Sequence, residues 1–142
     1  MPTITSRALG DQRGTSAIEF AIVFPVFLVL TFGMIAYGIY FGAAHSAAQL
    51  AADAARASVA GLTNKERGDL ARQHVTRNAA VYTLLEPQYV TTLAAAAPGD
   101  PTDFRVTVRY DAKTLPIWRL APFLPLPSEI IERTSTIKIG GY

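Results

Sequence analysis

A long run without charge near the N-terminus constrains this chain more than any other feature. No charged residue occurs from Phe20 to Ala44. As an α-helix, these roughly 25 positions exceed the hydrocarbon thickness of about 30 Å of a bilayer. A cleavable secretory signal has an apolar stretch of only about 7 to 15 residues, so ordinary signal peptidase processing is disfavoured. The run therefore predicts a helix that spans a membrane once, at about residues 20–44.

Length and composition exclude several classes of protein. With 142 residues, the chain holds one functional unit rather than two independent cores. The formal net charge of +2 is small and its basic residues are scattered, which argues against nucleic acid as a partner. Without cysteine, the chain has no disulfide or thiolate site. His45 and His74 lie on different expected helices, so we expect neither a metal site nor a cofactor.

A short polar leader, residues 1–14, precedes the apolar run. It carries Arg7 and Arg13 against Asp11, and basic residues favour the cytoplasmic side of a membrane. Arg56 beyond the span weakens this bias without reversing it. We expect a cytoplasmic N-terminus and an extracytoplasmic C-terminal part.

Glu19 stands one residue before the uncharged run. An unpaired carboxylate at the edge of a bilayer costs about a few kcal/mol, which makes Glu19 a candidate for function. The alternative is that its side chain reaches headgroup water or interacts favourably with the first turn of the helix. The residue alone leaves both interpretations open.

The spacing around Glu19 adds a resemblance. If the chain is cut between Gly14 and Thr15, Glu19 becomes the fifth residue of the mature protein and Phe20 the sixth. This segment resembles the processing site of type IV pilins. The short form, followed by a helix that contains Pro25, is most similar to TadE-like pseudopilins of tight adherence (Flp) pilus systems. The resemblance covers about the first 60 residues.

This resemblance implies a location, partners and a role for the motif. The implied location is the bacterial inner membrane, and the implied processing enzyme is a dedicated prepilin peptidase. Other pilin or pseudopilin subunits, the inner-membrane assembly platform and the lipid bilayer are the implied partners. The new α-amine on Thr15 could pair with Glu19 of a neighbouring subunit, because in low dielectric such a pair specifies register. Incorporation into a pilus stays open.

Two features within the span concern its packing. Pro25 removes a backbone donor and is expected to bend or loosen one turn. Gly38 and Gly42 form a GxxxG motif, with Gly33 before it, which allows close helix packing but also occurs by chance.

Beyond the span, alternating spacings of four and three continue the helix to about residue 60, with Gly61 as its stop. The residues in this stripe are Ala43, Ala47, Leu50, Ala54 and Ala57.

A small α+β domain is expected after the anchor helix. Thr63 and Glu66 form a capping box for a second helix that Pro87 ends. Alternation predicts a strand at residues 104–110 and a second at residues 133–139, with a weaker third at residues 89–93. Residues 94–102 are expected to be a turn-rich linker.

The segment from Leu115 to Pro127, hereafter the proline-rich segment, combines four prolines with large apolar residues. It is too apolar for a solvated linker, so we expect it to dock on the sheet or to contact another subunit. No pattern of nucleophile, phosphate loop or paired carboxylates occurs, and we expect no enzymatic activity.

The expected organisation is pilin-like and has three parts. These are a cleaved leader (1–14), an anchor helix (15–60) and an extracytoplasmic α+β domain (61–142) with a two- or three-stranded antiparallel sheet. The function expected from the resemblance is that of a pseudopilin that supports biogenesis of a tight adherence pilus. The alternatives are a periplasmic binding or enzymatic module tethered by the helix, and a type II secretion pseudopilin.

Overall fold

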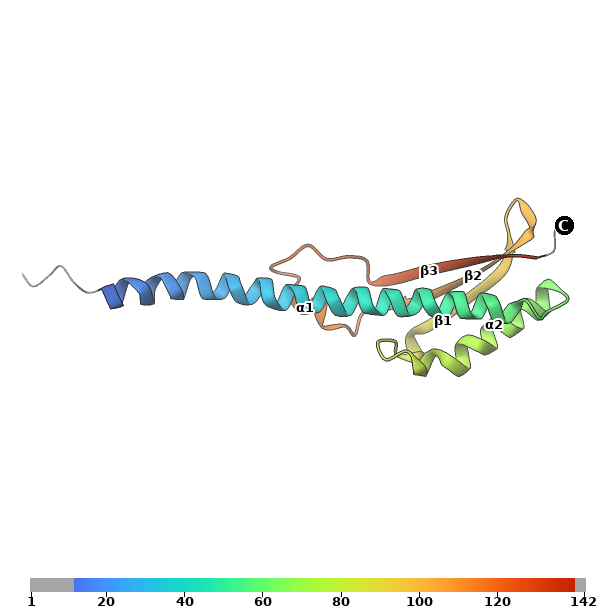
Figure 1. Cartoon of the computed structure of the whole chain (residues 1–142), viewed down its shortest axis with the longest axis horizontal. Helices are drawn as coiled ribbons and strands as arrows, with labels where there is room; N and C mark the ends of the chain where they lie inside the picture. Colours follow the sequence, from blue (N-terminus) through green and yellow to red (C-terminus); the bar gives the residue numbers. More distant parts are fainter. Residues whose placement is uncertain (1–11, 140–142) are drawn as a thin grey trace, which may run out of the picture.

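The computed structural model describes residues 12–139 and shows a long helix that carries a small α+β domain on its C-terminal half (Figure 1). Helix α1, Gln12–Ser58, has 47 residues and is roughly 70 Å long at its standard rise. The α+β prediction is confirmed. The other elements, in chain order, are α2 (Asn64–Asn78), η1 (Ala79–Val81), η2 (Pro87–Tyr89), β1 (Val90–Ala97), β2 (Asp100–Asp111), η3 (Pro116–Leu120) and β3 (Ile130–Lys138).

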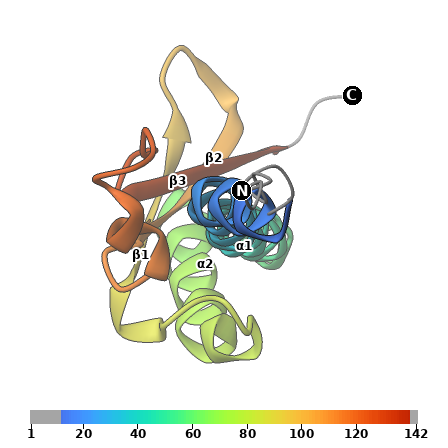
Figure 2. The same cartoon turned by 90° about the vertical axis from the view of Figure 1, so that its left-hand side faces the viewer.

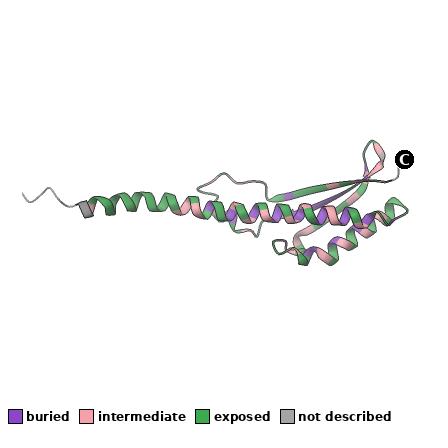
Figure 3. Cartoon of the chain, viewed as in Figure 1, coloured by how far each residue is buried: buried purple, intermediate pink, exposed green. Residues whose placement is uncertain are grey.

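Helix α1 divides into an exposed half and a half that belongs to the domain core (Figure 3). Nearly all side chains from Thr15 to Phe27 are exposed, whereas from Ala36 onward one face is buried. This face is built mostly of alanine, whose short side chain lets a sheet approach the helix axis closely. The predicted stripe is confirmed at four positions that are fully buried, namely Ala43, Ala47, Leu50 and Ala54.

The three strands form one antiparallel sheet in the order β1-β2-β3. Helix α1 packs against β2 and β3, and α2 packs against β1. The view along α1 shows α2 and the strands gathered on one side of it (Figure 2). The fully buried residues of β2 are Phe104, Val106, Val108 and Tyr110. Full burial of one large apolar side chain contributes about 1.5–3 kcal/mol to stability.

The expected linker at residues 94–102 is wrong, because most of it is strand. Ala94 to Ala97 belong to β1 and pair with β2, so that only Pro98 and Gly99 form the turn. Gly99 has a φ of 88°, a conformation that glycine adopts without steric cost. Alanine and proline have low strand propensity, and here the pairing with the strongly alternating β2 overrides that preference.

The second helix starts as predicted and ends earlier. The capping box of Thr63 and Glu66 is confirmed. Helix α2 ends at Asn78, whose side-chain amide donates to the carbonyl of His74 at 2.8 Å, rather than continuing to Pro87. A proline stops a helix that reaches it but does not make a helix extend as far as the proline. The end is set by the chain turning so that Leu85 becomes buried in the core.

The proline-rich segment docks mainly on α1 rather than on the sheet. Ile117 is fully buried, and the ring of Trp118 lies edge-on to Tyr40 with centroids 6.5 Å apart. The hydroxyl of Tyr40 donates to the carbonyl of Ser128 at 2.9 Å. These contacts place the segment beside the middle of α1 (Figure 1).

Gly61 is required for steric reasons where the chain turns from α1 into α2. Helix α1 ends at Ser58, three residues before the predicted stop at Gly61, and the φ of Gly61 is not positive. A Cβ there would lie 2.6 Å from the backbone nitrogen of Arg67 and 3.0 Å from its Cα. Backbone atoms inside a helix cannot move aside cheaply.

We therefore expect Gly61→Ala to lower the stability of the domain by about 1–3 kcal/mol, the usual cost of overpacking. Gly38→Ala is the matched control, because a Cβ at Gly38 meets nothing within 4 Å and alanine favours a helix. Thermal unfolding of both variants in detergent, followed by circular dichroism, checks this. Equal midpoints for Gly61→Ala and the unmodified chain would contradict it.

A polar contact ties the segment after α2 back to α1. The hydroxyl of Tyr82 donates to a carboxylate oxygen of Asp53 at 2.6 Å, and Arg56 holds the other oxygen at 2.7 Å. Asp53 and Arg56 stand three residues apart on α1 and form an ion pair there. Burial and then the hydrogen bond to Asp53 raise the pKa of Tyr82 to about 12.

This raised pKa predicts an alkaline loss of stability. The ordinary pKa of tyrosine is about 10, so between about pH 10 and 12 the unfolded chain releases the proton that the folded chain keeps, and stability falls as the pH rises. Tyr82→Phe is expected to cost about 1 kcal/mol at neutral pH and to flatten this decline. Denaturant unfolding at pH 8 to 12 measures both effects. Tyr89→Phe, whose ring packs beside Lys113, is the control and is expected to keep the decline.

Candidate functional site

The predicted motif lies in the first turns of α1. Gly14 and Thr15 are already helical, and the side chains from Thr15 to Phe20 are exposed. Residues 1–11, most of the predicted leader, lie outside the described residues. A cut between Gly14 and Thr15 would remove the first residues of the helix and leave the exposed turns that follow as the new N-terminus.

Glu19 presents an available carboxylate on this exposed surface. It is four residues from Thr15, so the two positions share one face of the helix. Within the part of the chain that the structure describes, Glu19 has no ion-pair or hydrogen-bond partner. Next to it, the rings of Phe20 and Phe24 stack with centroids 5.0 Å apart. The arrangement combines one acidic group with an otherwise apolar surface.

The exposed half of α1 has the surface of a membrane anchor. The segment from Gly14 to Ser58 contains a window of mean hydropathy 2.4, of which 6% is buried. A helix this apolar and this bare indicates a membrane anchor. Its polar Thr31 bonds the carbonyl of Phe27 at 2.8 Å, so this hydroxyl needs no water. The large exposed side chains are Ile18, Phe20, Ile22, Val23, Phe24, Val26, Phe27, Leu30, Phe32, Met34 and Ile35.

Pro25 does not interrupt α1, and two of the three glycines in the span face the chain's own domain. The helix runs through Pro25 without interruption (Figure 1). Gly42 lies against Leu84 and Gly33 against Leu124, both of the chain's own domain, whereas Gly38 faces open space. A second helix approaching at Gly38 would therefore meet Leu84 near Gly42. Part of the GxxxG surface serves intramolecular packing.

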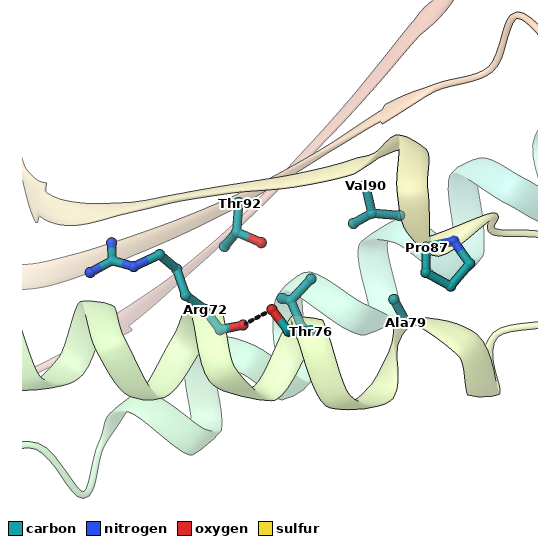
Figure 4. Close-up of a pocket in the computed structure, with 7 residues that line it drawn as sticks. Arg72, Thr76, Ala79, Pro87, Val90 and Thr92 are labelled. Atoms are coloured by element: carbon teal, nitrogen blue, oxygen red, sulfur yellow. Dashed lines mark hydrogen bonds between the residues drawn. The ribbon is translucent and has the colours of Figure 1, made fainter.

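A pocket of about 240 Å³ lies between α2 and β1 (Figure 4). It holds a single charged side chain, Arg72, which is paired with Asp69 at 2.6 Å. Thr76 bonds the carbonyl of Arg72 at 3.0 Å. The pocket lining contains no carboxylate or imidazole that could serve in acid–base chemistry. The lining residues are Arg72, Val75, Thr76, Ala79, Pro87, Val90 and Thr92.

The two histidines are not brought together with acidic groups. His45 lies 3.0 Å from the side chain of Gln49 on α1, and His74 is on α2. Among the described residues, no group of three His, Asp or Glu side chains is arranged to hold a metal ion. The candidate site that the sequence motif marks is the exposed surface of α1.

The first half of the long helix is bare and apolar, and its second half is covered by a sheet and a second helix. These features define a membrane-anchored α+β protein. The family model described as "TadE-like protein" matches residues 14–56. The matched residues are those whose motif and helix resemble TadE-like pseudopilins of tight adherence pilus systems in the sequence analysis, so the family model supports that resemblance over this part of the chain. The match starts at Gly14 and ends within α1, so the sheet lies outside it. No curated protein and no solved structure matches the chain.

Sequence reasoning missed the contacts that seat the domain on the middle of α1. Tyr37 and Tyr40 donate their hydroxyls to the carbonyls of Pro125 and Ser128. Both tyrosines stand in the uncharged run and were counted as part of the span. Their polar hydroxyls, near the small Gly33, are the signal that could have indicated a contact with the domain.

Proposed function

We propose that this chain is a pseudopilin that supports the biogenesis of a tight adherence pilus. A prepilin peptidase cuts between Gly14 and Thr15, and α1 holds the mature chain in the bacterial inner membrane with its domain in the periplasm. The observation that carries the proposal is Glu19, the fifth residue of the proposed mature chain, which stands on the exposed half of α1 without an ion-pair or hydrogen-bond partner among the described residues. The family match that starts at Gly14 supports it.

Cleavage creates a positively charged partner for Glu19, which has none among the described residues of the precursor. The α-amine of Thr15 has a pKa of about 8 and is mostly cationic at neutral pH. Within one chain, Thr15 and Glu19 share a helix face, so a solitary subunit can satisfy its own amine. Between subunits, a neighbour's Glu19 takes that place, and a slipped register would leave one charge unpaired in low dielectric.

The division of α1 suits assembly through its exposed half. The domain core is closed by α1, α2 and the sheet, so it does not require a neighbour to fold. The exposed turns from Thr15 to Phe27 are free to pack against helices of other subunits or of the assembly platform without disturbing the domain. The proposal includes no enzymatic step.

Processing is tested by sequencing the N-terminus of the membrane-bound protein from cells with an active prepilin peptidase. The mature chain is expected to start at Thr15. Gly14→Val is expected to keep residues 1–14 attached, because a branched side chain then replaces the glycine at the proposed cut. A wild-type chain that still starts near Met1 would contradict the proposal.

Assembly is tested by Glu19→Gln, which keeps size and removes charge. Cleavage is expected to continue, whereas surface pili are expected to fall at least about tenfold, a loss of about 1.4 kcal/mol or more in subunit interaction. Glu129→Gln, at an exposed carboxylate of the domain, is the control and is expected to leave pili unchanged. Normal piliation in both variants would favour a plain tethered module, and loss of protein secretion with pili intact would favour a type II system.

A further inference from the structure

The bare part of α1 is shorter than the uncharged run. Side chains from Thr15 to Phe27 are exposed, and these roughly 13 residues extend about 20 Å. From Val29 to Phe32 the helix already lines grooves with the proline-rich segment. A hydrocarbon core of about 30 Å that begins near Thr15 therefore ends close to Met34. The last ten residues of the uncharged run, from Ile35 to Ala44, lie where the domain already packs.

The proline-rich segment contacts α1 at this same height. The side chain of Leu124 occupies the space beside Gly33, at 2.9 Å from where a Cβ would stand. The hydroxyl of Tyr37 donates to the carbonyl of Pro125. Pro116 and Leu120 line a groove with Phe32. In a membrane that holds α1, this segment lies at the boundary of the leaflet on the domain side.

The surface that the segment offers at this height is apolar. Phe123 is 65% exposed, and Arg119 is the only charged residue of the segment. Two shallow grooves of about 200 and 260 Å³ lie between the segment and α1 and are lined by residues of both. Their linings are almost entirely apolar. They are the size of short stretches of acyl chain and stand on the surface of the bare helix.

The backbone of the segment is prepared for low polarity. Four of its residues are prolines, which carry no N–H group. Several remaining donors are satisfied locally, since Ala121 bonds the carbonyl of Trp118 and both Phe123 and Leu124 bond that of Leu120. An irregular segment is tolerated near lipid only when its backbone groups are satisfied in this way.

Aromatic residues surround the segment as they do at membrane interfaces. Trp118 packs on Tyr40, one turn from Tyr37. Tryptophan and tyrosine are enriched where headgroups meet the hydrocarbon, and the chain of Arg119 is long enough to carry its charge outward to headgroup phosphates.

We propose that the proline-rich segment is a second membrane contact, inserted into the headgroup–acyl boundary of the leaflet from which the domain emerges. Its partner is the phospholipid of the bilayer that α1 spans. The proposal depends on the membrane anchor alone. It holds whether or not Gly14 is cleaved and whether or not the chain takes part in pilus assembly.

The absence of cysteine allows site-directed spin labelling without background. The full chain is placed in phospholipid nanodiscs at one copy per disc, with a single label at Phe123→Cys. The matched sites are Val26→Cys on the bare helix and Leu62→Cys, 87% exposed at the far end of the domain. The relative collision rates with oxygen and with a water-soluble nickel chelate report depth.

At Phe123, the oxygen-to-nickel accessibility ratio is expected to lie near that of Val26 and several-fold above that of Leu62. A ratio equal to that of Leu62 would overturn the proposal. Protection that appears only in discs holding several copies would also overturn it, because the segment would then cover a second copy of the chain instead of lipid.

The unmodified chain supplies an independent measurement through Trp118, its single tryptophan. Lipids brominated near the headgroup end of the acyl chain are expected to quench its fluorescence more than lipids brominated near the methyl end. No quenching by either lipid would overturn the proposal, even if a labelled variant failed to fold.

Discussion

The close packing of a sheet and a second helix onto an alanine face of α1 is the interaction on which the rest of this structure depends. Ala43, Ala47 and Ala54 are fully buried, and larger side chains there would push β2 and β3 away from the helix. The same helix supplies the bare apolar half that indicates a membrane anchor. Anchor and domain therefore share one continuous element, and the fold of one fixes the position of the other.

The exposed half of α1 carries its chemistry in one place. A single carboxylate, Glu19, is followed by an entirely uncharged helix face. In the domain, by contrast, the ion pairs are exposed and solvated, as between Arg109 and Glu132 at 2.6 Å, and such pairs contribute little stability. The domain half of α1 is buried, and the exposed half carries the single carboxylate. This division agrees with a subunit that folds alone and associates through its anchor.

Sequence reasoning succeeded where periodicity was strong. The uncharged run, the alanine stripe, the capping box at Thr63 and the alternation in β2 each depend on local pattern, and the structure confirms them. Sequence reasoning failed where contacts with distant parts of the chain determine the local structure. Ala94 to Ala97 become strand only because β2 lies beside them, and the proline-rich segment finds α1 through Trp118 and Leu124, contacts that no spacing indicates. The motif around Glu19 was located by sequence, yet its exposure could only be seen in the structure.

The uninterrupted course of α1 has a mechanical consequence. From Gln12 to Ser58 the helix has no break, and the domain is fastened along its upper turns by burial and by the bond between Tyr82 and Asp53. No slack tether intervenes between lipid and domain. A torque or axial force on the exposed turns would thus reach the sheet through one continuous helix rather than through a flexible linker.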